Sequence, residues 1–505
     1  MPVDDDPQAP SNLLARSATA LKWNYAGVLV RVACQLAIGV ILARMLGPAP
    51  FGVVAIAWLL IGACNLFADF GLAAALVQKE HVAERDIRFV FTCQVALGAL
   101  LTGIGMLLAD WVASYFGVPD AAAPLRAMFG LFLIQSIGQT SAALLRRSLD
   151  FRYLQQISIG SYLLGYLAIG IPGAVAGWGV WALVAANLAQ ASASTIGLLV
   201  RARAPLGWAS HPSSDGLVRF GSKVVAANLS SWVLSNLDSL AVGRMLGVEA
   251  LGLYNRAVTL VSSPMGAFVS GLQGVLFAAC SRAQHQPHNL RRAYLGATTA
   301  VGLVCLPLFL SVAAVSDTVI VGLYGKDWVL AAAPLVPLAM AMPLVALLAV
   351  AGPVLMSMDR VSDELRAQAI VLVALLPLLY FASRNSIMAT GWAMLVIYAL
   401  RWVLLTRAVL GALSLRLAGL SAALAVPAVL TLFVVAAVWA VDRGLLWQGV
   451  AATTRLLLEV VAGAVALLVS LRVLGPRLLR GDLGDFLRAR GPLPAPLARL
   501  LNVDA

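Results

Sequence analysis

Charged residues are scarce in this chain. Asp, Glu, Lys and Arg make up 11% of the 505 residues, whereas soluble domains average about 25%. Apolar residues reach 61%, which is more than the core of one soluble domain can bury. Runs of about 18 or more apolar residues recur from Tyr25 to Val473, and each is typical of a membrane-spanning helix. The composition excludes a soluble enzyme and indicates a polytopic membrane protein.

Metal-ligating residues are also few. The five cysteines lie far apart inside apolar stretches and have no C-x-x-C spacing, so we expect small buried side chains and no disulfide framework. The four histidines lie in polar connections, where His285 and His288 form an H-x-x-H pair without a third ligand nearby. The sequence predicts no metal site and no cofactor.

No catalytic or nucleotide-binding motif is visible. The chain has no G-x-S-x-G, Walker or H-E-x-x-H pattern, and no D-x-D in a suitable loop. The net charge of +12 is compatible with nucleic acid, but the basic residues fall between the apolar runs, where membrane topology explains them. We expect neither an enzyme nor a nucleic-acid-binding protein.

The apolar runs predict an all-α protein with about fourteen transmembrane helices. Each run can cross about 30 Å of hydrocarbon as a helix, and a helix pairs all of its backbone groups inside lipid. A β-barrel would need short strands that alternate in polarity, and these runs are apolar on all faces. The predicted spans are 24–46, 51–77, 89–109, 125–145, 154–176, 178–200, 221–246, 250–280, 293–315, 329–356, 365–383, 387–409, 417–441 and 456–473.

The basic residues predict the orientation. With the N-terminus inside, 26 of the 35 lysines and arginines fall on the cytoplasmic side and seven on the other. This bias favours cytoplasmic termini and an even number of spans. The N-terminus is acidic and the first apolar run is too long for a signal peptide, so no cleavable signal is expected.

An internal repeat divides the chain. Residues 44–47 and 244–247 both read Arg-Met-Leu-Gly, and the same offset of 200 residues pairs Gly52 with Gly252. Six spans separate the copies, so both halves enter the membrane in the same sense and form a parallel repeat about a pseudo-two-fold axis. The predicted parts are an N-terminal tail (1–22), an N-lobe of spans one to six (23–200), a cytoplasmic linker (201–220), a C-lobe of spans seven to twelve (221–410), spans thirteen and fourteen (411–475) and a C-terminal tail (476–505).

Polar side chains at membrane depth mark the candidate site. A charge in hydrocarbon is costly, so these side chains are expected to face protein or water. They form stripes at helical spacing on spans one, seven and eight, and we expect these three spans and span two to flank a central opening. The candidate substrate-binding residues are Arg31, Gln35, Asn228, Ser235 and Arg256, and the candidate ion-coupling or gating residues are Asp69 and Asp238.

Two readings of the charged residues stay open. Arg31 and Asp69 lie at similar depths, as do Asp238 and Arg256, so each pair is compatible with a structural salt bridge. The alternative is a water-filled cavity in which an arginine binds an anionic head group and a carboxylate takes a proton or a sodium ion.

Three segments resemble polysaccharide flippases of the Wzx-like group, within the multidrug/oligosaccharidyl-lipid/polysaccharide exporter superfamily. They are ILARMLGPAPFGVVAI at 41–56, ADFGLAAALVQ at 68–78 and LLRRSLDFRY at 144–153. The resemblance implies two lobes around a central cavity that opens to one side at a time. It also implies transfer of a polyprenyl-diphosphate-linked oligosaccharide across the bacterial cytoplasmic membrane, with Arg31 as the residue that holds the diphosphate or acidic sugars. The chain departs from the family's pattern at residues 358–360, which read Met-Asp-Arg.

The resemblance also implies a role and partners. We expect export of a glycan for exopolysaccharide, capsule or O-antigen synthesis, with membrane lipids, a polysaccharide polymerase and glycosyltransferases as partners. Alternatives are a cation-coupled small-molecule exporter of the same superfamily and a non-catalytic member of a polysaccharide assembly complex. A membrane glycosyltransferase or ligase is a further class, but no long external loop carries a catalytic carboxylate.

Overall fold

All regular secondary structure in the described residues is helical. A computed structural model describes residues 10–68, 76, 82–205, 207–209, 232–283 and 287–479. Among these residues, eleven helices are long and apolar enough to cross a membrane, and the shorter helix Pro48–Cys64 is also apolar. The prediction of an all-α polytopic membrane protein is confirmed. The chain divides into two compact units, Met1–Gly252 and Leu253–Ala505.

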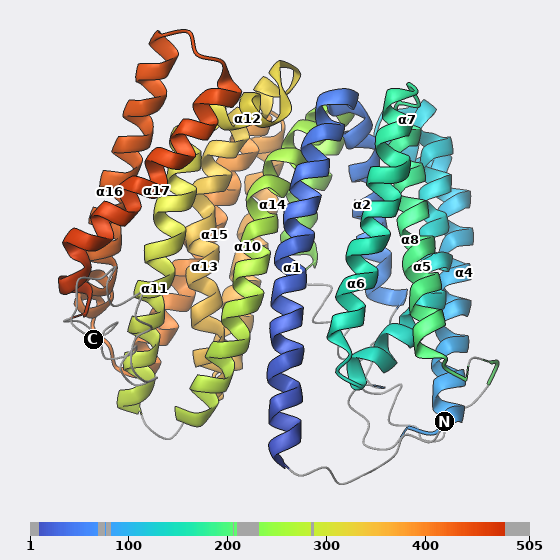
Figure 1. Cartoon of the computed structure of the whole chain (residues 1–505), viewed down its shortest axis with the longest axis horizontal. Helices are drawn as coiled ribbons and strands as arrows, with labels where there is room; N and C mark the ends of the chain where they lie inside the picture. The colour runs from blue at the N-terminus through green and yellow to red at the C-terminus, as the bar shows by residue number, and fades with distance from the viewer. Residues whose placement is uncertain are drawn as a thin grey trace. The chain divides into compact units, whose positions relative to one another are not determined.

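The helices of the first unit run roughly along one direction (Figure 1). They are α1 (Pro10–Leu46), α2 (Pro48–Ala68), α4 (Glu84–Tyr115), α5 (Ala122–Arg147), α6 (Phe151–Tyr162), α7 (Ile171–Val175) and α8 (Val180–Ala202), with a 3-10 turn η1 (Pro119–Ala121), a π-helical segment η2 (Leu163–Gly170) and a helix over 232–245.

Small and hydroxyl side chains bring α4 and α5 together. A Cβ on Gly105 would lie 2.7 Å from a ring carbon of Phe129, so glycine permits this close approach. The Thr102 hydroxyl donates to the Phe129 carbonyl oxygen at 3.2 Å, and the buried Thr140 hydroxyl donates to Gln94 at 2.6 Å. Buried polar groups need such partners, so these hydrogen bonds fix the position of α5 along α4.

The sequence repeat is visible in the local structure. Gly47 ends α1 with φ +70°, Gly247 follows the helix over 232–245 with φ +90°, and new helices begin at Pro48 and Val248. Only glycine adopts such φ values without strain. The contacts are reciprocal: a Cβ on Gly52 would clash with the carbonyl oxygen of Val248, and a Cβ on Gly252 with that of Pro48.

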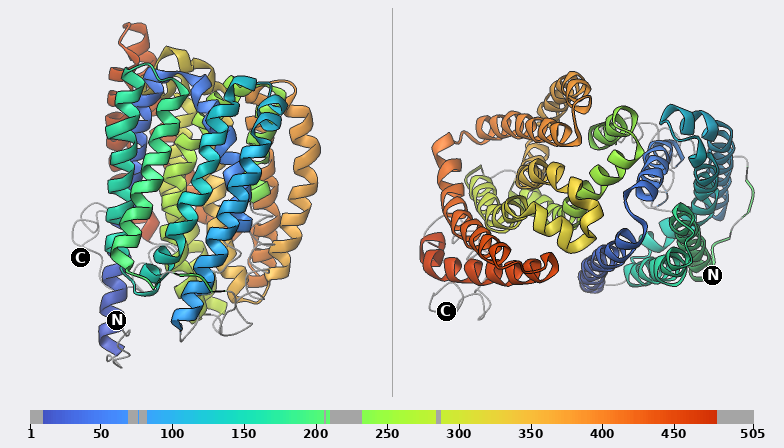
Figure 2. Two further views of the ribbon diagram at one scale, coloured as in Figure 1. Left: turned by 90° about the vertical axis from the view of Figure 1, so that its right-hand side faces the viewer. Right: turned by 90° about the horizontal axis from the view of Figure 1, so that it is seen from above.

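The second unit is a helical bundle of its own. Its helices are α10 (Val248–Ala283, which begins in the first unit), α11 (Pro287–Ala314), α12 (Ser316–Tyr324), the 3-10 helix η3 (Lys326–Ala331), α13 (Ala332–Ser357), α14 (Val361–Ser383), α15 (Ile387–Leu413), α16 (Leu417–Trp447) and α17 (Ala452–Leu479). The yellow-to-red helices of Figure 2 include α16 and α17, which pack on each other, while α16 packs on α11 and α17 on α12.

The helices follow the predicted spans in order, with two differences. The predicted span 154–176 is continuous but consists of α6, η2 and α7, because η2 widens the helix where it packs on α8. Helix α12 lies in a predicted connection; its nine residues rise about 14 Å, too few to cross a membrane. The predicted spans 51–77 and 221–246 run into residues outside the described part, and α10 covers 250–280 but is not among the eleven.

Candidate functional site

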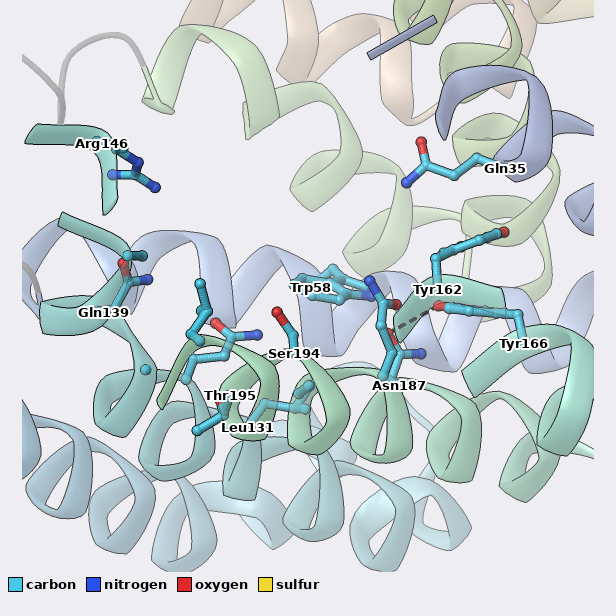
Figure 3. A pocket seen from close by; sticks show the side chains of 16 residues that line it. Gln35, Trp58, Leu131, Gln139, Arg146, Tyr162, Tyr166, Asn187, Ser194 and Thr195 are labelled. Carbon is cyan, nitrogen blue, oxygen red and sulfur yellow. Dashed lines mark hydrogen bonds between the residues drawn. The ribbon is translucent and has the colours of Figure 1, made fainter. Parts of the chain in front are cut away.

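A polar pocket of about 500 Å³ lies within the first unit (Figure 3). Helices α1, α2, α5, α6 and α8 and the segment η2 contribute to it. Its lining residues carry amides, hydroxyls and aromatic rings, beside apolar residues and one arginine: Gln35, Trp58, Leu131, Gln135, Gly138, Gln139, Ala142, Arg146, Tyr162, Tyr166, Asn187, Gln190, Ala191, Ser194, Thr195 and Leu198. This volume is in the range of pockets that hold small ligands.

Two helices present parallel rows of polar residues to the pocket. On α5 the row includes Gln135 and Gln139, and on α8 it includes Asn187, Gln190 and Ser194. Spacings of three and four residues place side chains on one face of a helix. The Thr195 hydroxyl donates to the Ile134 carbonyl oxygen at 2.8 Å and so joins α8 to α5. The rows therefore have a fixed relation to each other.

An aromatic pair, formed by the last residue of α6 and a residue of η2, lies at one end of the pocket. The rings of Tyr162 and Tyr166 stack with centroids 4.6 Å apart. The Tyr166 hydroxyl donates to Asn187 Oδ1 at 3.0 Å, drawn dashed in Figure 3, and the Asn187 amide donates to the Leu183 carbonyl oxygen at 2.8 Å. Both Tyr166 and Asn187 are thereby oriented before any ligand binds.

Gly165 allows this arrangement. A Cβ at this position would lie 2.8 Å from Gln190 Cβ and still closer to the Ala186 carbonyl oxygen on α8. Only glycine therefore permits η2 to approach the α8 backbone this closely. π-helical turns inside α-helices occur often at functional sites, and here the turn aims two tyrosines at the pocket.

The pocket is almost uncharged. Of its lining residues, Arg146 is the one with a formal charge, and it lies at the end opposite Tyr162 and Tyr166 (Figure 3). Amides and hydroxyls both donate and accept hydrogen bonds, and tyrosine and tryptophan rings offer flat apolar faces. Such a lining suits a neutral ligand with many hydroxyl groups, with an anionic group favoured near Arg146.

The structure places the predicted residues of span one in different surroundings. Gln35 lines the pocket. Arg31, one turn earlier on α1, is half-buried against α6, where its Nη1 donates to the Ser158 hydroxyl at 3.3 Å. Its Nε is buried and has no hydrogen-bond partner among the described residues. The Arg31 guanidinium therefore keeps a donor for a further acceptor.

Among the described residues, Ser235, Asp238 and Arg256 do not line the pocket. Asn228 and Asp69 lie outside the described residues. Ser235 is exposed, whereas Asp238 is buried and its Oδ1 accepts from the Ser239 backbone N–H at 2.7 Å. Arg256 lies in the second unit, with its guanidinium carbon 5.5 Å from the centre of the Tyr324 ring. Pairing of Asp238 with Arg256 stays a prediction, and so do the assigned roles of these residues.

Sequence reasoning predicted Gln35 but missed the other lining residues of the pocket, because it gave most weight to charged residues at membrane depth. One signal was present: Gln135 and Gln139 lie four residues apart in one apolar run, as do Gln190 and Ser194 in another. Paired amides and hydroxyls at this spacing predict a polar face on a membrane helix. The contributions of Tyr162 and Tyr166 depend on η2, which no sequence pattern indicated.

Comparison with known proteins identifies relatives in polysaccharide synthesis. A family model described as "Polysaccharide biosynthesis protein" matches residues 41–333. The chain is 27% identical to the teichuronic acid biosynthesis protein TuaB of Bacillus subtilis (strain 168), over 54% of this chain and 56% of that protein. It is 28% identical to the succinoglycan biosynthesis transport protein ExoT of Rhizobium meliloti (strain 1021), over 57% and 58%.

A third relative is the lipopolysaccharide biosynthesis protein WzxC of Escherichia coli (strain K12), which is 23% identical over 63% of this chain and 65% of that protein. The chain thus spans less than two thirds of the length of these curated relatives. The family model covers α2 to α8 and every lining residue of the pocket except Gln35.

Solved structures show the same fold. The lipid II flippase MurJ in an inward closed conformation matches with a TM-score of 0.69 at 11% identity, over 92% of this chain and 99% of that one. An inward-facing multidrug resistance transporter of the MATE family matches with a TM-score of 0.52 at 14% identity, over 78% and 93%. At these identities the matches establish the fold alone.

Proposed function

Because the chain belongs to the polysaccharide biosynthesis protein family, we propose that it moves a lipid-linked oligosaccharide across the bacterial cytoplasmic membrane by alternating access. The transfer involves no covalent chemistry, and the glycan serves exopolysaccharide, capsule or O-antigen synthesis. In this proposal glycosyltransferases build the substrate on the cytoplasmic side and a polymerase uses it on the other, and both termini of the chain face the cytoplasm.

The neutral polar pocket is the observation that carries the proposal. An oligosaccharide presents many hydroxyl groups, which amide and hydroxyl side chains bind in both directions. The amides of Gln135, Gln139 and Gln190 supply such groups from two helices, and Tyr162 and Tyr166 supply ring faces. A lipid tail can remain in the bilayer while the head group is bound, because the pocket needs to replace only the water around the sugars.

Two kinds of relative support the proposal. TuaB, ExoT and WzxC are named for the biosynthesis or transport of surface polysaccharides. MurJ, whose fold the chain shares, is named a lipid II flippase. Alternating access requires the substrate to bind the two end states differently, because a ligand shifts a conformational equilibrium only through such a difference.

Arg31 is proposed to attract the diphosphate that links the glycan to its lipid. Its Nη1 donates a hydrogen bond to the Ser158 hydroxyl. Its buried Nε–H has no hydrogen-bond partner among the described residues. A charged donor forms short, strong hydrogen bonds with phosphate oxygens, and guanidinium offers two parallel donors. Gln35, one turn further along α1, then lies on the side of the sugars. Asn228, Ser235 and Arg256 are proposed to contact the substrate, and Asp69 and Asp238 to gate or couple its movement.

Genetic replacement in the source bacterium tests this function. Deletion of the gene is expected to remove the surface polysaccharide and to cause lipid-linked oligosaccharide to accumulate inside the cell. Gln139→Leu keeps the side-chain volume but removes hydrogen bonds worth about 0.5–1.5 kcal/mol, so it is expected to weaken substrate binding roughly two- to tenfold. Gln156→Leu, at an exposed position outside the lining, is the matched control.

Two results would contradict the proposal. Normal surface polysaccharide in the deletion strain, without accumulated precursor, would exclude this transport role. Equal export by the Gln139→Leu and Gln156→Leu variants at equal protein levels would exclude the pocket as the glycan site while leaving the transport role intact.

A further inference from the structure

Four polar side chains meet inside the second unit, away from the pocket. Asp442 lies near the end of α16, Arg455 and Glu459 lie one turn apart near the start of α17, and Thr318 lies in the first turn of α12. Asp442 is 7% exposed and Glu459 is 3% exposed. Carboxylates are rarely buried to this extent without a cation or several donors.

Hydrogen bonds account for Asp442 but not for Glu459. The Thr318 hydroxyl donates to Asp442 Oδ1 at 2.7 Å, and Arg455 Nη1 donates to the same oxygen at 3.4 Å. Both carboxyl oxygens of Glu459 are buried and have no hydrogen-bond partner among the described residues, and neither does Arg455 Nε. Glu459 lies four residues after Arg455, so its side chain is on the same face of α17 as the arginine that contacts Asp442.

The charges of this cluster balance only when one carboxyl is neutral. If both carboxyls are ionised, two negative charges face one guanidinium, and a buried carboxylate without hydrogen bonds is strongly disfavoured. If Glu459 carries a proton, its O–H can donate to the Asp442 carboxylate, while Arg455 balances the charge of Asp442. Two adjacent carboxyl groups commonly share one proton for this reason.

Within the described parts of α12, α16 and α17, no other charged group changes this balance. On α12, Asp317 is exposed. On α16, Arg443 lies over the ring of Trp439, with its guanidinium carbon 5.7 Å from the ring centre. On α17 itself, Arg472 is more than three turns from Glu459.

We propose that Glu459 and Asp442 form a proton-binding site that joins α12, α16 and α17. The proton lies between the two carboxyl groups, Thr318 and Arg455 hold the Asp442 carboxylate, and loss of the proton leaves two negative charges beside one cation. Helices α12 and α17 are in close contact, because a Cβ on Gly322 of α12 would lie 3.0 Å from the Ala452 carbonyl oxygen of α17. A change of charge in the cluster therefore acts directly on this contact. Removing the proton is therefore expected to loosen the contact of α17 with α12 and α16.

Infrared difference spectroscopy of the purified full-length protein tests the site. At neutral pH the wild type is expected to show a carboxylic-acid C=O band that is lost in Glu459→Gln. Glu84→Gln is the matched control, because Glu84 is exposed and pairs with Arg88, so its ionised carboxylate contributes no such band. A spectrum in which Glu459→Gln loses no acid band would overturn the proposal.

Thermal unfolding gives a second, independent readout. Glu459→Gln resembles the protonated state, so it is expected to unfold at the wild-type temperature at neutral pH. The wild type is expected to become less stable as the pH rises and the proton leaves, whereas Glu459→Gln lacks this part of the pH dependence. A large loss of stability in Glu459→Gln at neutral pH would show an ionised Glu459 paired with Arg455 and would overturn the proposal.

A third variant covers the case in which Glu459→Gln is not recovered. Asp442→Asn leaves Glu459 as the only carboxyl beside Arg455, so Glu459 is expected to ionise and the acid band to disappear at neutral pH. A band that persists in Asp442→Asn would contradict sharing of the proton with Asp442. If sodium ions stabilise the wild type but not Glu459→Gln, the cluster binds a metal cation, and this result would also overturn the proposal.

Discussion

Gly165→Ala is the substitution whose effect follows most directly from the structure of the pocket. The new methyl group would lie 2.8 Å from Gln190 Cβ and closer still to the Ala186 carbonyl oxygen. The oxygen belongs to the backbone of α8 and cannot rotate away. The segment η2 would therefore have to move from α8 by roughly 1 Å, the kind of adjustment that overpacked cores require.

The magnitude follows from two opposing effects. Overpacking of a well-packed interior costs about 1–3 kcal/mol, whereas replacement of a helical glycine by alanine contributes about 0.5–1 kcal/mol of stability. Gly165→Ala is thus expected to destabilise the first unit by up to about 2.5 kcal/mol. The same movement would stretch the 3.0 Å hydrogen bond from Tyr166 to Asn187 beyond bonding range, so polysaccharide export is expected to fall as well.

Gly160→Ala is the matched control. This glycine lies five residues earlier in the same span, is exposed, and has no atom within 4 Å of the position that a Cβ would occupy. It is expected to unfold at or slightly above the wild-type temperature. Thermal unfolding in detergent, followed by the fluorescence of a thiol-reactive dye, compares the two variants. An unfolding temperature for Gly165→Ala equal to or above that of Gly160→Ala would refute the packing argument.

Three further predictions test other parts of the account. Tyr166→Phe keeps the stacked ring but removes the hydrogen bond to Asn187, and export is expected to fall severalfold with a stability loss of about 0.5–1.5 kcal/mol; unchanged export would remove the hydroxyl from the site. Gly52→Ala is expected to destabilise the protein, whereas Gly103→Ala, which meets open space, is not; equal unfolding temperatures would contradict the close contact at Gly52. Arg31→Ala is expected to abolish export at a normal protein level, and Arg31→Lys to retain part of it, because lysine keeps the charge but not the paired donors; export lost only through lost protein would indicate a structural role.

Hydropathy was sufficient to predict the membrane helices because the hydrocarbon imposes one simple requirement on every span. The run 387–409 begins at the residue where α15 begins, and the repeat at 44–47 and 244–247 marks two equivalent glycine turns. These features depend on local sequence, on apolar length and on the φ values open to glycine. The α12 helix escaped prediction because it is too short to meet the length requirement.

The candidate site was harder to predict because it depends on contacts between distant residues. Tyr166 and Asn187 meet only because Gly165 lets η2 approach α8. A stripe of polar residues on span one predicted Gln35, but the other lining residues, most of which are also neutral, were not predicted. Asp442 and Glu459 were overlooked because they lie near the ends of the predicted spans 417–441 and 456–473, where charge is common.

Reconstitution into liposomes tests the central claim most directly. A lipid-linked oligosaccharide with a fluorescent label on its sugar is placed in both leaflets, and an impermeant quencher reports the fraction that reaches the outer leaflet. The wild-type protein is expected to make the protected fraction accessible, and the double variant Gln139→Leu/Gln190→Leu is expected to do so much more slowly. Wild-type liposomes that behave like protein-free liposomes, or a double variant as fast as the wild type, would contradict the account.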